Sequence, residues 1–242
     1  MKALLSAVAA CGQASCPVPT LDEPLLDDLR TTTLPAGTWL RRAHHLTHPD
    51  PARLAPPRGD ARFSPLPRTL HAYLATSTIA VLLETAFHDA APPCPRIADL
   101  VLRRWAESAV RTGQDLQLVD LRDAELARLG LARSDLVAAT AAHYPCTRTW
   151  AVRLQHRRID GAPVAGLLWH SRQAELYADA SAQRPALRDL TAAERHDVAV
   201  VWSPPAPASV LATSEPGLGL LDAGPGRRYV DDAIALLGIV TQ

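Results

Sequence analysis

The chain has 242 residues, 48% of them hydrophobic and 21% charged, and its 25 basic side chains balance its 25 acidic ones. This composition excludes a disordered or fibrous protein, and the zero net charge argues against nucleic acid or an anionic membrane surface as the main partner. No stretch approaches the roughly 20 apolar residues of a membrane-spanning helix, so we expect no membrane insertion.

The cysteines indicate the compartment. Cys11, Cys16, Cys94 and Cys146 include no C-x-x-C pair and lack zinc-finger spacing, so we expect a reduced, cytoplasmic protein without a metal site. Residues 1–11 look like a short lipoprotein signal, but their apolar run is short and rich in alanine. The start of a helix is therefore the favoured interpretation, and export is the alternative.

The first third of the chain predicts a helix, a strand and a long loop. Leucines at helical spacing predict an amphipathic helix over residues 20–30, and a turn at 34–37 leads into a predicted strand at 38–44. The many prolines of residues 48–67 predict a loop, with one extended piece at 61–64.

A strand followed by a helix comes next. Residues 71–75 predict a buried strand, and Thr76 or Ser77 caps a predicted helix that runs to about His88. Glu84 lies on a stripe next to the apolar face of this helix. We therefore expect its carboxylate at the edge of the core rather than in bulk water.

The rest of the chain mixes short strands with short helices. It predicts strands at 116–121, 166–171 and 197–202 and helices at 123–129, 134–143, 146–155 and 230–237. The irregular order favours a single α+β domain with a mixed or antiparallel sheet core and flanking helices. The last helix is expected to complete the core, with docking of a partner or second subunit as the alternative.

Standard motifs are missing. Residues 217–222 lack the third glycine of a dinucleotide fingerprint and predict a turn. Ser171 lacks the flanking glycines of a nucleophile elbow, which disfavours that class of hydrolase. The histidines at positions 44, 45 and 48 lie beside prolines, so a solvated loop is favoured over a metal site.

Scattered residues remain that carry chemistry: Arg42, Arg62, Tyr73, Glu84, Ser171 and Arg172. Each has an ordinary structural interpretation when taken singly. Such an Arg is usually a solvated or paired group, a strand Tyr belongs to the core, and a Ser at a strand end belongs to a turn.

Taken together, these residues lie in sequence blocks that resemble the RES domain, a family named for its Arg, Glu and Ser. The blocks are LPAGT at 34–38 leading into LRRAH at 40–44, ARFSP at 61–65, YLA at 73–75 with LETAFHD at 83–89, and GLLWHSR at 166–172. Weaker echoes, LVDL at 118–121 and YPCTRTWA at 144–151, fall between them. The resemblance covers residues 34–203, which leaves 1–33 as an N-terminal helical extension and 204–242 as a C-terminal extension packed on the domain.

The resemblance implies a fold related to ADP-ribosyltransferases and a toxin-like enzyme. Such an enzyme cleaves the nicotinamide–ribose bond of NAD+, which is a substrate rather than a resident cofactor, with inorganic phosphate or water as acceptor. An Xre-type antitoxin that covers the active site is the implied partner, and a homo-oligomer stays open. The alternatives are transfer of ADP-ribose to a protein and a non-catalytic module that binds a nucleotide or a partner.

The same resemblance places the catalytic residues at Arg42, Tyr73, Glu84 and Ser171, and further nucleotide-binding residues at Arg62, Phe63, His88, Trp169 and Arg172. Arg42 is preferred to Arg41 because Ala43 and His44 follow it as the pattern requires. Residue chemistry agrees, since a carboxylate stabilises an oxocarbenium ion and guanidinium groups bind pyrophosphate. We expect Ser171 to orient Glu84 or to bind substrate, and His88 either to contact Glu84 or to end the helix.

Overall fold

Eight strands form the central sheet of the computed structural model, which describes residues 10–48, 50–56, 61–64, 66–67, 69–90, 92–180, 196–202 and 210–242. The strands are β1 (Thr31–Leu34), β2 (Trp39–His45), β3 (His71–Ala75), β5 (Trp105–Thr112), β6 (Leu116–Asp120), β9 (Gly166–His170), β10 (Asp197–Trp202) and β11 (Leu211–Leu220). Their order across the sheet is β1-β6-β9-β10-β3-β2-β5-β11. The sheet is mixed, because β6 and β9 run parallel whereas the other neighbours run antiparallel. Two short pairs complete the strands: β4 (Arg96–Ile97) with β12 (Val240–Thr241), and β7 (Arg158–Ile159) with β8 (Ala162–Pro163).

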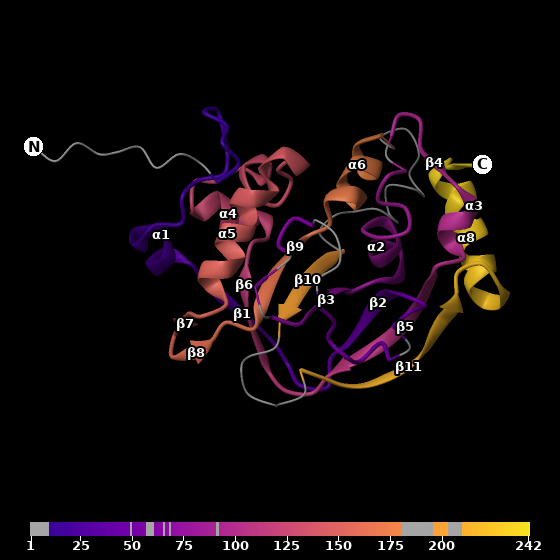
Figure 1. Ribbon diagram of the computed structural model, residues 1–242, viewed down its shortest axis with the longest axis horizontal. Helices are drawn as coiled ribbons and strands as arrows, with labels where there is room; N and C mark the ends of the chain where they lie inside the picture. The colour runs from indigo at the N-terminus through magenta and orange to yellow at the C-terminus, as the bar shows by residue number, and fades with distance from the viewer. Residues whose placement is uncertain are drawn as a thin grey trace, which may run out of the picture.

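The helices gather in two groups beside the sheet (Figure 1). The group on the left in this view contains α1 (Glu23–Asp28), α4 (Asp123–Arg128) and α5 (Tyr144–Leu154). The group on the right contains α2 (Thr78–Leu83), α3 (Asp99–Leu102), α6 (Arg172–Ala180) and α8 (Gly224–Leu237). α2 is shared between two core clusters, since its Val81 packs in the cluster of α5 and its Leu82 packs in the cluster of α8.

The centre of the sheet is buried on both faces. Along β10, Val198 and Val200 pack in the cluster that contains α5, whereas Ala199 and Val201 pack in a cluster on the opposite face. Side chains alternate along a strand, so burial on both faces explains why the central strands read as continuous apolar runs. The prediction of an α+β domain with a mixed sheet and flanking helices is confirmed.

Most predicted elements are confirmed close to their expected positions. The predicted strands at 38–44, 71–75, 116–121, 166–171 and 197–202 are β2, β3, β6, β9 and β10, and the predicted helices at 20–30, 123–129, 146–155 and 230–237 correspond to α1, α4, α5 and the second half of α8. The last helix contributes buried Val230, Ala233 and Leu237 to the core, as expected.

Four local predictions are wrong. Residues 61–64 form a tight turn instead of an extended piece, because the Ala61 N–H bonds the Ser64 carbonyl at 3.0 Å. The predicted helix over 134–143 is two separate 3₁₀ turns, Arg133–Asp135 and Ala141–His143. The Asp135 carboxylate accepts the Ala132 N–H at 2.8 Å, and this local hydrogen bond competes with a continuous helix. The predicted turn at 217–222 mostly belongs to β11, which pairs with β5.

The fourth error concerns the helix that carries Glu84. α2 ends at Leu83 instead of continuing to His88, and Glu84 is its C-terminal capping residue. Beyond this point the Phe87 N–H bonds the Leu82 carbonyl at 2.8 Å, and the Phe87 ring is fully buried. Burial of that ring outweighs the tendency of the segment to remain helical.

Both predicted extensions contribute to the domain. Within 1–33, β1 supplies an edge strand, and Leu21, Leu26 and Leu29 join the core. Within 204–242, β11 forms the other edge and α8 packs on the sheet. Residues 1–9, on which the lipoprotein-like signal falls, lie outside the described residues, and the domain boundaries themselves stay a prediction.

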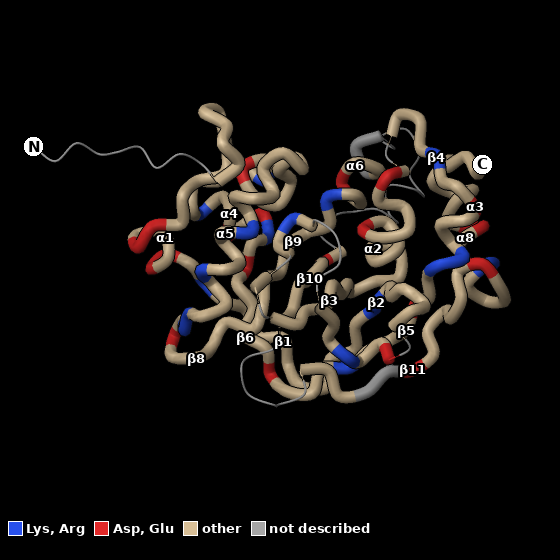
Figure 2. The backbone as a smooth tube through the Cα atoms, viewed as in Figure 1, with Lys and Arg blue, Asp and Glu red and all other residues tan. Residues whose placement is uncertain are grey.

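Charges of both signs are spread along the described chain (Figure 2). The acidic helix α1 lies near basic positions of the α5 region, and Glu23 pairs with Arg153 at 3.1 Å and with Arg157 at 2.7 Å. Among the described residues, no helix has the length and apolar character needed to span a membrane.

Candidate functional site

The Glu84 carboxylate lies between the end of α2 and the beginning of α6, two helices that run close together in Figure 1. Its Oε1 accepts the Ser171 hydroxyl at 2.7 Å and the Gln173 backbone N–H at 3.1 Å. Both hydrogen bonds from the described residues end on Oε1, so Oε2 receives none from them. Glu84 is half-buried, which leaves this carboxylate oriented by the protein on one side and accessible on the other.

Ser171 links Glu84 to α6. It is fully buried, and its Oγ accepts the Ala174 N–H at 3.1 Å, so it caps the helix that begins at Arg172. Its hydroxyl proton goes to Glu84, so the geometry suits orientation of the carboxylate rather than nucleophilic attack. The N-terminus of α6, which carries a partial positive charge, faces the Glu84 carboxylate through the Gln173 N–H.

Arg62 lies within electrostatic range of this carboxylate, on a tight turn in which Ala61 and Ser64 form a β-bridge. Its Nη1 donates to the Ala139 carbonyl, and its guanidinium lies 5.2 Å from the centre of the Tyr144 ring. Burial lowers the pKa of Arg62, and the nearby Tyr144 and Glu84 counteract that shift. The negative charge of Glu84 therefore acts on the Arg62 guanidinium.

Three aromatic side chains, those of Phe63, Tyr73 and Trp169, pack together and support the Arg62 turn. Phe63 packs edge-on against Trp169 at 5.1 Å, and Tyr73 packs edge-on against the same ring at 6.3 Å. The Tyr73 hydroxyl accepts the Phe63 N–H and donates to Ser64 Oγ, both at 3.3 Å. Burial raises the pKa of Tyr73 to about 12, so its hydroxyl stays protonated. Phe63 and Trp169 are buried core residues that hold the turn in place.

Arg42 is separated from this group. Its guanidinium is buried and donates Nη1 to the Pro51 carbonyl and to the Arg53 carbonyl, the latter at 2.8 Å. Burial lowers its pKa to about 10. Ala43 packs in the cluster that contains Tyr73, and strand alternation puts Arg42 on the opposite face of β2.

Arg41 shares the face of Ala43 but points to another partner. It is the register partner of Ala75, and its Nη1 lies 3.5 Å from the buried carboxylate of Glu107. A shift of one residue along β2 thus decides which arginine reaches which side of the sheet. In this structure neither of them contacts Glu84.

His88 and Arg172 also have defined places. His88 is exposed, and its Nδ1 lies 3.1 Å from the Asp89 carboxylate rather than on Glu84, because α2 ends before it. Arg172 directly follows Ser171 and donates Nη1 to Glu175 at 2.9 Å. Its charge lowers the pKa of Arg62 further, so it belongs to the same group. The structure thus brings five predicted site residues together: Arg62, Tyr73, Glu84, Ser171 and Arg172. Phe63 and Trp169 pack against Tyr73 or the Arg62 turn, whereas Arg42 and His88 lie apart from the group.

Gln173 is a further residue at this site that no sequence motif marks. Its backbone N–H bonds Glu84, and its buried amide oxygen has no hydrogen-bond partner among the described residues. Buried oxygens usually have a hydrogen-bond partner, so this one is a candidate acceptor for a ligand N–H. A sequence signal for Gln173 exists nevertheless. The run of helix-forming residues after Ser171 identifies that serine as a helix cap and therefore places the Gln173 N–H in the first turn of the helix.

Two further features lie elsewhere. His44 uses both ring nitrogens, with Nε2 3.1 Å from Ser108 Oγ and Nδ1 3.0 Å from the His48 carbonyl. A cavity of about 180 Å³ is lined partly by Leu40, Leu74 and Leu168, which belong to the cluster on the face opposite α5. The Glu84 group lies outside that cavity.

Comparison with known proteins supports the fold. No family model matches the chain, and no curated protein matches it. A chain in the crystal structure of the M. tuberculosis MbcT–MbcA toxin–antitoxin complex is similar to it, with a TM-score of 0.51 and 16% sequence identity. The match covers 88% of this chain and 100% of that chain, so the likeness extends over nearly the whole domain.

Proposed function

We propose that this protein cleaves the nicotinamide–ribose bond of NAD+, with phosphate or water as acceptor, and acts as a toxin. The observation that carries the proposal is the Glu84 carboxylate, held through Oε1 by Ser171 and Gln173. The resemblance of its sequence blocks to the RES domain and the likeness of its fold to a chain from a toxin–antitoxin complex both support it.

Glu84 has the properties that this reaction requires. When the C1′–N bond breaks, its electron pair goes to nicotinamide, which leaves as a neutral molecule, so no general acid is needed. Positive charge builds up on the ribose, and an acceptor oxygen then forms the new bond to C1′. When water is the acceptor, it gives up one proton to the solvent. A fixed carboxylate beside the ribose stabilises that charge without reorganising during the reaction. In the proposal Oε2 contacts the ribose, because Oε1 is already engaged.

Arg62 and Arg172 are the proposed contacts for the pyrophosphate. Both belong to the Glu84 group, and guanidinium groups form paired hydrogen bonds with phosphate oxygens. Tyr73 positions the Arg62 turn through its hydrogen bond from Phe63. The family pattern places Arg42 among the catalytic residues. In this structure its guanidinium instead donates hydrogen bonds to the carbonyls of Pro51 and Arg53.

A protein partner forms part of the proposal. A toxin that consumes NAD+ in the cytoplasm would harm its own cell unless an inhibitor covers its site. We propose an antitoxin of the Xre type in this role. The MbcT–MbcA structure is that of a toxin–antitoxin complex, and the likeness of the present fold to it supports a partner of this kind.

The test is to identify products. The purified protein is incubated with NAD+, with and without inorganic phosphate, and the products are separated by chromatography and identified by mass. We expect free nicotinamide in both reactions. A phosphorylated ADP-ribose that forms only with phosphate identifies phosphate as the acceptor, and plain ADP-ribose throughout identifies water.

Two results would redirect the proposal. ADP-ribose found covalently attached to a protein would indicate a transferase that uses the same carboxylate. NAD+ that stays intact at every enzyme concentration, for the parent and for Glu84→Gln alike, would contradict cleavage and favour a module that only binds a nucleotide or a partner.

A further inference from the structure

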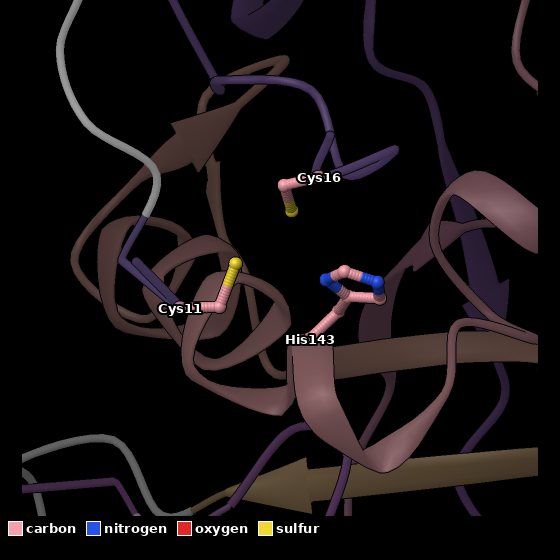
Figure 3. A group of neighbouring side chains, drawn as sticks. All are labelled: Cys11, Cys16 and His143. Carbon is pink, nitrogen blue, oxygen red and sulfur yellow. The ribbon is translucent and has the colours of Figure 1, made fainter. Parts of the chain in front are cut away.

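A second group of chemically reactive side chains lies between the N-terminal segment and α5. Cys11 and Cys16 come from the N-terminal segment, His143 ends the 3₁₀ turn Ala141–His143, and Cys146 lies in the first turn of α5. Figure 3 shows the sulfur atoms of Cys11 and Cys16 and one edge of the His143 ring pointing toward a common space. The ligand atoms of these three residues all lie within 4.8 Å of one another.

Cys146 lies beside these three residues and contacts two of them. Its Sγ lies 3.6 Å from the Cys16 Sγ and 3.3 Å from the Cys11 backbone nitrogen. We propose that Cys11, Cys16, His143 and Cys146 bind one zinc ion as a structural site. Three thiolates and one imidazole form a common ligand set for zinc in tetrahedral geometry.

The distances fit a metal better than a disulfide. Zinc–sulfur bonds of about 2.3 Å place two sulfurs of a tetrahedral site about 3.8 Å apart. A disulfide requires about 2.05 Å between its sulfurs. The 3.6 Å between Cys16 and Cys146 is therefore close to the separation of two zinc ligands, and all four cysteines are free in the structure.

An unsatisfied nitrogen points to the same conclusion. His143 Nδ1 is buried and has no hydrogen-bond partner among the described residues. A divalent cation supplies the missing partner for the nitrogen and allows all three sulfurs to ionise together.

Binding releases three protons, one from each thiol, and joins the ligands to zinc through the sulfur and nitrogen lone pairs. All four positions are then filled by protein, which is the arrangement of a structural zinc rather than a catalytic one. Such a site ties the N-terminal segment to α5, beside the hydrogen bond from Trp150 Nε1 to the Pro19 carbonyl at 2.8 Å. It also fixes the segment around Tyr144, whose ring lies under Arg62.

The first test measures metal content and thiol reactivity in the full chain. The protein is dialysed against zinc and then against metal-free buffer, and we expect one zinc to remain per chain. A thiol-reactive dye, located by peptide mass, should label exposed Cys94 quickly in all samples. Cys11 and Cys16 should react quickly only after a chelator removes the zinc.

Variants locate the site. Cys16→Ser, Cys146→Ser and His143→Ala should each lose the bound zinc, whereas Cys94→Ser is the matched control and should retain it. Because a ligand variant can fail to fold, cobalt is also substituted into the parent protein. There we expect the intense visible bands of a tetrahedral site and thiolate-to-cobalt charge transfer.

Three results would overturn the proposal: a parent protein that retains no zinc, a zinc that survives in all three ligand variants, or a Cys16–Cys146 disulfide in freshly purified protein. None of these readouts depends on NAD+ cleavage.

Discussion

Glu84 and Glu107 each accept a hydrogen bond from a distant backbone amide, and their surroundings differ. Glu84 accepts Gln173 N at 3.1 Å and remains half-buried at the end of α2. Glu107 on β5 is fully buried, accepts Leu218 N at 2.6 Å and pairs with Arg41 at 3.5 Å. Gly217 lies so close to it that an added Cβ would meet Oε2 at 2.1 Å.

The comparison separates two uses of a negative charge. The chain closes around Glu107, whose charge secures the irregular part of β11 between Pro216 and Gly219. Glu84 is held on one oxygen only, so its charge is available to a ligand. Both carboxylates accept an ordered hydrogen bond. Glu84 is the candidate for catalysis because it is more accessible than Glu107.

The largest expected effect comes from Glu84→Gln. Glutamine preserves the oxygen that accepts from Ser171 and Gln173 but removes the charge that, in the proposed reaction, stabilises the ribose cation. We expect kcat for NAD+ cleavage to fall by about 10²–10³-fold. The melting temperature should stay close to that of the parent. Nicotinamide release, measured with circular dichroism on the same samples, checks both statements, and a variant as active as the parent would contradict the role of Glu84.

The next effect concerns His71, a third titratable group that the fold encloses. Burial, aided by the charge of Arg42, lowers its pKa from 6.5 to about 4. The unfolded chain therefore binds the proton more readily, and the stability from neutral His71 is complete above pH 6.5 and is lost as the pH falls toward 4. The loss amounts to about 3 kcal/mol.

Urea unfolding of the parent and of His71→Gln across this pH range tests the statement. The parent should lose stability more steeply than the variant on acidification. His156→Gln, at an exposed histidine, is the control and should follow the parent. Equal slopes for the parent and His71→Gln would assign the acid sensitivity to other groups.

A smaller effect is expected for Glu107→Gln. Removing one charge of a buried pair is costly, but the Arg41 side chain is 40% exposed, so water compensates part of the loss. We expect the free energy of unfolding to fall by about 1–2 kcal/mol, with kcat unchanged for the folded fraction. Activity lost without any change in stability would place Glu107 in the site and remove the contrast with Glu84.

Local patterns account for the central strands but not for the edge of the sheet. β3, β9 and β10 are apolar runs buried on both faces, so periodicity and composition located them. β5 contains Glu107 and Ser108 among its apolar residues, and β11 contains Pro216 and two glycines, so each looks unlike a strand until it pairs with the other. Their stability comes from long-range contacts, which a local pattern does not contain.

The candidate site shows the same division. Ser77 is a typical helix-capping residue, so its position before an apolar run predicted the start of α2. The end of that helix depends on the burial of Phe87. Strand register decides that Arg42 lies away from Glu84, and sequence spacing does not specify register. The Cys16 and Cys146 sulfurs meet across 130 positions, a separation that hides them from any search for short metal motifs.

The finest distinction concerns two serines that both cap helices. Ser171 Oγ accepts Ala174 N at 3.1 Å and donates to Glu84, whereas Ser77 Oγ accepts Ala80 N at 3.2 Å and lies 2.7 Å from His196 Nδ1. Replacing either by alanine removes a helix cap, which costs about 1 kcal/mol of stability. Only Ser171→Ala also releases the Glu84 carboxylate. We therefore expect Ser171→Ala alone to reduce kcat, by about tenfold, because a hydrogen bond to a charged group is worth about 1.5 kcal/mol or more.

Steady-state kinetics and thermal unfolding of the two variants separate orientation from capping. The loss in Ser171→Ala should fall on kcat rather than on the KM for NAD+, since the proposed pyrophosphate contacts of Arg62 and Arg172 remain. If Ser77→Ala reduced kcat as much as Ser171→Ala, capping alone would explain both losses. Glu84 would then be oriented by the Gln173 amide and the α6 N-terminus, without the hydroxyl.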